Sequence, residues 1–281
     1  MNIVNKIVAL NDVGVASSEA SEARVRTGAS MLAPATAHPQ SLLDLPPGEA
    51  RESLLAVHDI LTAMLQPSEL AVYEAGGGST SFMPLEMLER SHVTVVDIDE
   101  DQIRYNDYAQ EKILGDIQTY RFKPNSFDLV ICYNVIEHLA DVGAALSGFC
   151  QALKPGGLIL IGAPNPRSLS GVITKYSPHW VHVWFYRHVR GEELAGRPGH
   201  PPFPTFFHPL ATRSNLAAFA KVNGLQVIYQ KEYESPRYPE MRLRKPVLAA
   251  VLDGVARILN LLRRSDGDVR RGDYHMILRK R

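Results

Sequence analysis

Cysteine is scarce in this chain, and neither sign of charge is in excess. Its 281 residues include two cysteines, Cys132 and Cys150, and thirty lysines and arginines against thirty acidic residues. Two cysteines in separate apolar segments argue against a disulfide framework or a metal role, and they favour a reducing, cytoplasmic location. The balanced charge argues against the basic field with which many proteins attract nucleic acid.

Long hydrophobic runs are also missing. The apolar run at residues 7–10 ends at Asn11 and Asp12, too early for the hydrophobic region of a secretory signal. The first 47 residues are rich in alanine, serine, threonine and proline without sustained periodicity, so we expect a flexible arm over residues 1–47. The remaining residues, 48–281, are enough for one domain with a large core.

The chain is organised around an acid followed by glycines, in the sequence VYEAGGGST of residues 72–80. An apolar run leads into Glu74, and glycines after a strand let a ligand approach backbone N–H groups closely. A second apolar run, residues 93–96, ends at Asp97, about 20 residues beyond the glycines, where an acid can meet a ribose diol. This spacing predicts a nucleoside site at the carboxyl edge of a parallel sheet.

The carboxylate of Glu74 indicates the charge of the ligand. It would repel a pyrophosphate on the glycine loop and attract a cation. S-adenosylmethionine carries an ammonium and a sulfonium on an adenosine, so it suits this acid better than NAD does. On its own, a run of three glycines is equally typical of an ordinary turn.

Apolar runs and helical periodicities alternate along the middle of the chain, which predicts an α/β protein with a doubly wound parallel sheet. Glu74, Asp97, Asp116 and Asn134 each stand at or just after a strand end. Because ligands bind at the carboxyl ends of such strands, we expect these side chains to share one rim. Asp99, just before a helix, is predicted to be its N-cap. The predicted strands are residues 70–74, 93–97, 112–114, 127–133, 157–163, 225–229 and 274–278, and the predicted helices are residues 49–66, 81–90, 100–110, 141–153, 212–223 and 246–264.

The order of these motifs resembles the class I S-adenosylmethionine-dependent methyltransferases, a family with a seven-strand Rossmann-like sheet whose last strand is antiparallel. The resemblance is dense over residues 70–164 and weaker towards the C-terminus. One departure is Thr80, where the family often has a further glycine. The motifs are EAGGG at 74–78, Asp97, GDI at 115–117, FDLVICYN at 127–134, EHL at 137–139 and LKPGGLIL at 153–160.

The resemblance implies S-adenosylmethionine as the cofactor and gives each motif a role. It implies that Glu74 and the glycine loop hold the methionine moiety and that Asp97 binds the ribose hydroxyls. It also implies that Asp116 faces the adenine and that Asn134 lies under the cofactor. The cofactor-binding residues so implied are Glu74, Ala75, Gly76, Gly77, Gly78, Asp97, Ile98, Asp116, Ile117 and Asn134.

Residues 164–211 are rich in proline, glycine, histidine and aromatic residues, with little regular periodicity. Long segments of this kind are usually functional lids or disordered, and the aromatic density argues against disorder. Because the segment follows the fifth strand, we expect a lid insertion that covers the cleft and forms much of the acceptor pocket. His182 and His188 are candidates for a general base. Nothing fixes a ligand geometry, so we expect no metal.

Residues 246–264 form a strongly amphipathic helix that we expect to pack on the core or to form a homodimer. Its basic flanks, Lys245 and Arg263–Arg264, also permit contact with a membrane surface. The helix is too short and too charged to span a bilayer.

The resemblance implies methyl transfer by in-line displacement to a small-molecule acceptor, and oxygen is the expected atom. No signature of a nucleic-acid substrate appears, and the amino-methylation motif of Asn or Asp, two prolines and an aromatic residue is absent. Two alternatives remain open. One is an NAD(P)-dependent oxidoreductase on the same architecture, against which Glu74 argues, and the other is a non-catalytic module that retains the cofactor fold.

Overall fold

The structure is a computed structural model that describes residues 45, 47–66, 68–188, 191–197, 202–262 and 267–281. All of them belong to one compact unit, Thr36–Arg281. The arm predicted at residues 1–47 falls almost entirely outside the described residues. Of the helices that the structure describes, none is both long and apolar enough to cross a bilayer.

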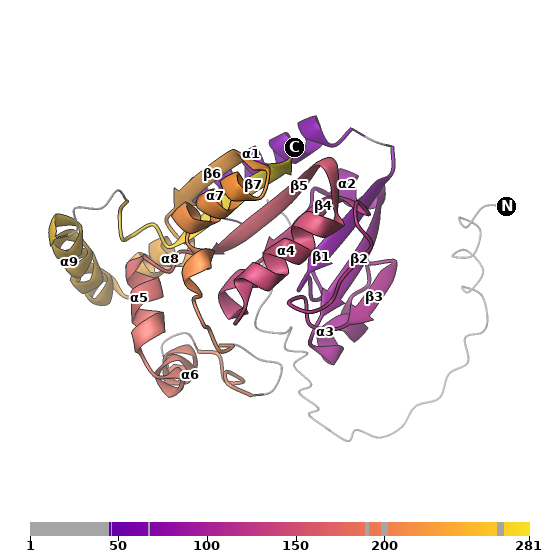
Figure 1. The fold of residues 1–281 in the computed structure, drawn as a ribbon. Helices are drawn as coiled ribbons and strands as arrows, with labels where there is room; N and C mark the ends of the chain where they lie inside the picture. Colours follow the sequence, from indigo (N-terminus) through magenta and orange to yellow (C-terminus); the bar gives the residue numbers. More distant parts are fainter. Residues whose placement is uncertain (1–44, 46, 67, 189–190, 198–201, 263–266) are drawn as a thin grey trace, which may run out of the picture. The chain divides into compact units, whose positions relative to one another are not determined.

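A seven-stranded sheet carries the fold, with the strand order β3-β2-β1-β4-β5-β7-β6 (Figure 1). Strands β1 to β5 are parallel, and β7 runs antiparallel between β5 and β6. The predicted α/β sheet with an antiparallel last strand is therefore confirmed, and the strand order reverses between β1 and β4. The strands are β1 (Leu70–Ala75), β2 (Ser91–Asp97), β3 (Glu111–Leu114), β4 (Phe127–Tyr133), β5 (Leu153–Pro164), β6 (Leu225–Tyr233) and β7 (Asp273–Lys280).

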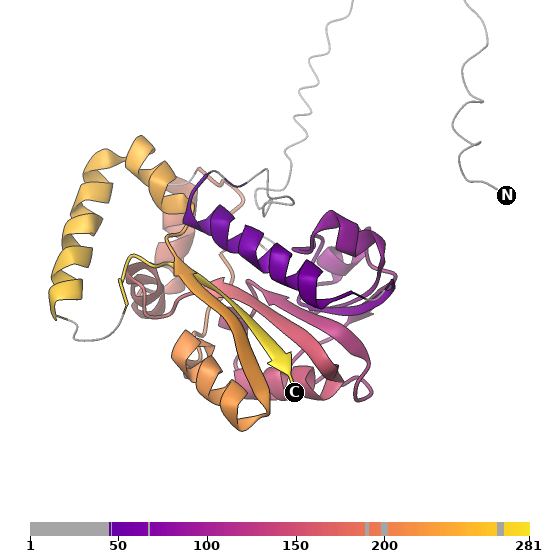
Figure 2. The ribbon, with the colours of Figure 1, turned by 90° about the horizontal axis from the view of Figure 1, so that it is seen from above.

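Helices cover both faces of the sheet (Figure 2). Because side chains alternate along a strand, Val72 of β1 joins one core and Tyr73 joins the other. The first core lies under α1 (Glu49–Met64), α2 (Leu85–Glu89) and α3 (Glu100–Tyr105). The second lies under α4 (Val142–Ala152) and α7 (Arg213–Val222), where Phe149 packs edge-on against Tyr73.

The segment after β5 is more helical than its sequence indicated. It contains α5 (Leu169–Tyr176), whose N-cap Ser168 accepts a hydrogen bond from Gly171 N, and α6 (His179–His188). A further helix that the sequence analysis missed, α8 (Arg237–Arg244), precedes α9 (Pro246–Leu262). These four helices lie beyond the end of β5 (Figure 1).

Three predicted boundaries were wrong, each for a local reason. Helix α2 begins only at Leu85, because the residues before it form a loop that Ser81 ties to Glu74. Helix α3 ends at Tyr105, since the next residue, Asn106, takes an extended conformation and its side chain donates to Gly78 O at 2.7 Å. Strand β5 begins at Leu153 rather than at residue 157, because Leu153 already pairs with Phe127.

Candidate functional site

The structure brings the predicted rim together. In the sheet β1 lies between β2 and β4, so that Glu74 is level with Val95 on one side and with Ile131 on the other. Asp97 ends β2 beside Leu114 of β3. The carboxyl ends of these parallel strands therefore form one edge, at the point where the strand order reverses, which is where ligands bind in open α/β sheets.

The loop after β1 requires its glycines. Gly76 and Gly78 have φ values of 69° and 55°, which favour glycine. A Cβ atom on Gly76 would come within 2.6 Å of a Val135 methyl group, and one on Gly77 would lie 2.8 Å from Glu74 Cβ. The loop is thus a backbone surface packed against its neighbours from behind, and Gly76 N–H is held within it by a hydrogen bond to Val96 O at 2.8 Å.

Glu74 is a buried carboxylate at the end of β1. Glu74 is 1% exposed, and its two carboxylate oxygens accept hydrogen bonds from the hydroxyl groups of Ser81 and Tyr108. Burial raises the pKa of the Glu74 carboxyl to about 7, against the lowering effect of the two hydroxyl donors. No lysine, arginine or histidine forms an ion pair with it within the described part of the chain. A cation placed here would therefore gain a partner that is already desolvated.

Asp97 faces the glycine loop. Its Oδ2 accepts from Gly78 N at 3.0 Å and its Oδ1 accepts from Asp99 N at 2.9 Å. Burial raises the pKa of the Asp97 carboxyl. A carboxylate has about four lone-pair sites, so two hydrogen bonds leave acceptor capacity for a diol. The next residue, Ile98, is 76% exposed and offers an apolar surface beside it.

The N-cap prediction for Asp99 is confirmed. Its Oδ1 accepts from Asp101 N at 2.9 Å and from Gln102 N at 3.1 Å, at the start of α3. This capping role separates Asp99 from Asp97, as expected from its position just before a helix.

The remaining predicted cofactor residues, Asp116, Ile117 and Asn134, differ in their burial and hydrogen bonding. Asp116 accepts from its own turn, through Gln118 N at 2.8 Å, and Ile117 is buried in the core. Asn134 has a φ of 56°, and its backbone N–H donates to Gly162 O at 2.7 Å. The chain therefore turns sharply where it leaves β4, next to the end of β5.

A buried polar cluster, which no sequence pattern predicted, adjoins this edge. His275 of β7 is 1% exposed. Its Nε2 lies 2.6 Å from the Tyr133 hydroxyl and 2.8 Å from the Tyr233 hydroxyl, and its Nδ1 lies 2.8 Å from Ser53 Oγ of α1. Burial lowers the pKa of the His275 imidazole to about 3, so the ring is neutral at pH 7. On the loop after the glycines, Phe82 stacks on Tyr133 with ring centroids 3.7 Å apart.

The two candidate bases lie on α6. His182 Nε2 is 2.6 Å from Ser177 Oγ, and the ring of His188 lies 5.5 Å from that of Trp184. Partial burial, together with His179, lowers the pKa of His182. Within the described residues, no hydrogen bond joins either histidine to Glu74 or Asp97. Their role as general bases therefore stays a prediction.

After α6, residues 204–207 contact the turn that follows β4. Phe206 N and Phe207 N donate to Glu137 O at 2.9 and 3.2 Å, and His138 Nδ1 lies 2.7 Å from Pro204 O. Glu137 and His138 follow Asn134 in the turn after β4, so this part of the segment packs beside the predicted cofactor residues. Within the described residues, no group of three or more histidine, cysteine or acidic side chains has a metal-binding arrangement.

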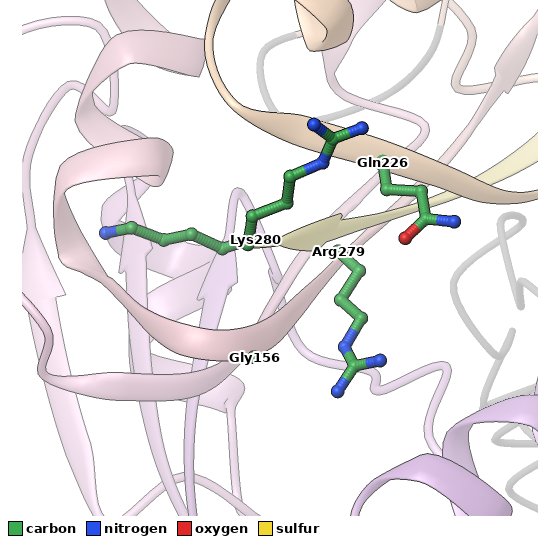
Figure 3. Close-up of a pocket in the computed structure, with 5 residues that line it drawn as sticks. Gly156, Gln226, Arg279 and Lys280 are labelled. Carbon is green, nitrogen blue, oxygen red and sulfur yellow. The ribbon is translucent and has the colours of Figure 1, made fainter.

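A surface pocket lies at the opposite edge of the sheet (Figure 3). It is lined by Gly156, Gln226, Arg279, Lys280 and Arg281. Arg279 pairs with Leu158 near the start of β5, so the pocket stands at the amino edge of the parallel strands. Lys280 Nζ donates to the carbonyls of Leu153 and Cys150 at 2.6 and 2.8 Å, a structural role at the end of α4.

Comparison with known proteins agrees with this geometry. A sheet of this order with an acid and a glycine loop at the switch point is the arrangement of a nucleoside-binding α/β domain. Residues 73–161 match the family model described as "Methyltransferase domain". This match confirms the resemblance to the class I S-adenosylmethionine-dependent methyltransferases that the sequence motifs indicated.

Three curated relatives are 27–30% identical to this chain within the aligned regions. A ubiquinone biosynthesis O-methyltransferase of Caulobacter sp. (strain K31) is 30% identical over 36% of this chain and 46% of its own length. The same-named protein of Caulobacter vibrioides is 27% identical over 63% of this chain and 79% of its own length. A malonyl-[acyl-carrier protein] O-methyltransferase of Yersinia pestis is 27% identical over 47% of this chain and 49% of its own length. The chain thus spans about half the length of the first and third relatives.

Proposed function

We propose that this protein transfers a methyl group from S-adenosylmethionine to an oxygen atom of a small-molecule acceptor. The observation that carries the proposal is Glu74, a buried carboxylate at the switch point with no cationic partner among the described residues, beside a glycine loop that side chains cannot fill. An ammonium group satisfies such a carboxylate, whereas a pyrophosphate does not. The names of the matching relatives support oxygen as the methylated atom.

The residues of the rim would divide the cofactor between them. Glu74 and the backbone of Ala75 to Gly78 would hold the methionine end, and Asp97 with Ile98 would hold the ribose. Asp116 and Ile117 would contact the adenine, and Asn134 would lie beneath the cofactor. The support for these assignments is the shared edge and the remaining acceptor capacity of Asp97.

The protein's contribution to the reaction would be alignment and exclusion of water. S-adenosylmethionine supplies an electrophilic methyl group on a positively charged sulfur, which the acceptor oxygen attacks in line with the breaking carbon–sulfur bond. Glu74 and Asp97 would fix the two ends of the nucleoside so that the methyl group points out of the rim. Residues 164–211 would cover the acceptor, since their return at Phe206 and Phe207 packs on the turn after β4.

Several finer assignments stay predictions. His182 or His188 would take the acceptor proton only if α6 approaches the rim when the acceptor binds. A homodimer or a membrane surface would involve residues 246–264, whose described part is α9. The cytoplasmic location also remains a prediction from the sequence.

Calorimetric titration tests the cofactor assignment. We expect S-adenosylmethionine and S-adenosylhomocysteine to bind with micromolar affinity and NADH not to bind. Asp97→Ala should lower the affinity for both nucleosides by about 10- to 100-fold. The reason is that the ribose diol loses hydrogen bonds to a charged carboxylate, which contribute about 1.5–3 kcal/mol to binding. Asp101→Ala is the matched control, since Asp101 is exposed at the start of α3 and pairs only with Arg104 among the described residues.

Two results would refute the proposal. Folded protein that binds neither nucleoside, after removal of any co-purified ligand, would exclude methyl transfer as its activity. Binding of NADH in place of the two nucleosides would favour the dehydrogenase alternative.

A further inference from the structure

Exposed apolar side chains gather on the four helices beyond β5. Thirteen of the twenty-two exposed large hydrophobic residues in the described part of the chain lie on α5, α6, α8 and α9. Scattered exposed hydrophobic residues are normal, but a concentration on one group of helices marks an interaction surface. The thirteen are Ile173, Tyr176, Trp180, Trp184, Phe185, Leu243, Val247, Leu248, Val251, Val255, Ile258, Leu261 and Leu262. We call them the apolar helix surface.

Helix α9 shows that this exposure is organised. Its inner face is occupied, since Leu252, Ala256 and Leu259 pack with Leu169 of α5. At 3.6 residues per turn, the exposed residues from Val247 to Leu262 fall within an arc of about 140° on the other side. The helix therefore presents a second apolar stripe that its packing on α5 does not use and that has no partner among the described residues.

The charge around the apolar helix surface is positive. The four helices carry five lysines and arginines whose side chains the structure describes, against two acids, Glu240 and Asp253, although the whole chain is balanced. Glu240 is paired with Arg244 at 3.1 Å, and Asp253 is paired with Arg242 at 3.3 Å. Arg242 also pairs with Glu234, which precedes α8, at 2.8 Å. Arg257 is exposed beside the apolar residues. The five basic residues are Lys175, Arg187, Arg242, Arg244 and Arg257.

The aromatic residues of the surface are of the type found at lipid–water interfaces. The chain has two tryptophans, and both lie on α6, where Trp180 is 69% and Trp184 is 53% exposed. Tyr176 at the end of α5 is 77% exposed. Tryptophan and tyrosine favour the headgroup region of a bilayer because one end of each ring system is apolar and the other is polar.

We propose that the apolar helix surface docks the protein onto the surface of a bilayer that contains anionic lipids. Helix α9 would lie in the plane of the interface, with its stripe from Val247 to Leu262 among the acyl chains and its basic residues at the headgroups. A second copy of the chain is the competing occupant. It is disfavoured because a symmetric contact would place two positively charged surfaces against each other, whereas anionic headgroups attract them.

Co-sedimentation with vesicles tests the proposal. We expect the full chain to sediment with phosphatidylcholine vesicles containing 30% phosphatidylglycerol and to remain largely in solution with phosphatidylcholine alone. Val251→Asp combined with Ile258→Asp should lower the vesicle partition coefficient at least tenfold, because both positions are exposed and their substitution spares the packed face of α9. Val222→Asp, at an 85% exposed position on α7, is the matched control and should bind like the wild type.

Tryptophan emission supplies a second measurement without a label, since both tryptophans belong to α6. We expect the emission maximum to shift to shorter wavelength when the anionic vesicles are added, and brominated lipid to quench it. Emission that stays unchanged while the protein is bound would overturn the assignment of α6 to the docking surface.

Three further results would overturn the proposal as a whole. These are a wild-type chain that stays in solution with anionic vesicles, a double variant that binds them equally well, and a wild-type dimer by light scattering that the double variant converts to monomers. None of these results bears on S-adenosylmethionine binding, which is measured without lipid, so failure here is distinguishable from failure of the proposed methyl transfer.

Discussion

Glu74→Gln is expected to make the ligand-free protein more stable at pH 8 while it weakens S-adenosylmethionine binding. The pKa of the Glu74 carboxyl is about 7 in the folded protein against an ordinary value of 4.5. Ionised Glu74 therefore lowers the free energy of unfolding by about 3 kcal/mol above pH 7, and this cost disappears as the pH falls to 4.5. A neutral amide removes the cost, but it also removes the charge that would hold the ammonium group, so we expect affinity to fall about 10- to 100-fold.

Urea unfolding and calorimetric titration at pH 8 measure the two effects. Glu89→Gln, at an exposed position of α2, is the control and should change neither quantity. If Glu74→Gln lowered stability and left the affinity unchanged, Glu74 would be a structural residue, and the proposed methionine site would be wrong. The opposite changes in stability and affinity are typical of a binding residue held in an unfavourable environment.

His275→Gln is expected to remove much of the loss of stability in acid. The pKa of His275 is about 3 in the folded protein against 6.5 ordinarily, because its ring is buried. The folded state excludes the proton that the unfolded state binds below pH 6.5. His275 therefore does not affect the free energy of unfolding above pH 6.5, and it lowers this free energy by up to about 5 kcal/mol as the pH falls to 3. Glutamine can still bond the hydroxyl groups of Tyr133, Tyr233 and Ser53, but it does not titrate.

The two buried groups oppose each other between pH 7 and 4.5. Over this range, protonation of Glu74 raises the free energy of unfolding by about 3 kcal/mol, and the exclusion of a proton from His275 lowers it by a similar amount. As the pH decreases from 7 to 4.5, we therefore expect the free energy of unfolding of the wild type to stay nearly constant. It should fall for Glu74→Gln and rise for His275→Gln. Parallel profiles for all three proteins would contradict both assignments, and His92→Gln, at an exposed position of β2, controls for loss of a histidine.

The sheet and its rim were predictable because they depend on local patterns. Apolar runs that end in Glu74 and Asp97 are short and sharply bounded, and the spacing of acids and glycines follows from the parallel connection of neighbouring strands. Asp99 was predictable as an N-cap for the same reason, since capping involves only the next few residues.

The partners of the rim were not predictable, because they are distant in sequence. Tyr108 bonds Glu74 from a loop 34 residues away, and His275 meets Ser53 across 222 residues. Neither contact leaves a spacing signal. Helices α5 and α6 were missed for a different reason: several of their large side chains, including Trp180 and Trp184, are exposed, so the usual contrast between an apolar and a polar helix face is absent.

The place of β7 has a consequence for the order of folding during synthesis. Strand β6 is made before β7, yet within the described sheet it pairs only with β7, which lies between it and β5. Until β7 has left the ribosome, β5 therefore exposes an unpaired strand edge, and β6 has no strand to pair with. Open strand edges invite pairing with other chains, so the nascent protein would depend on chaperones until this late strand inserts.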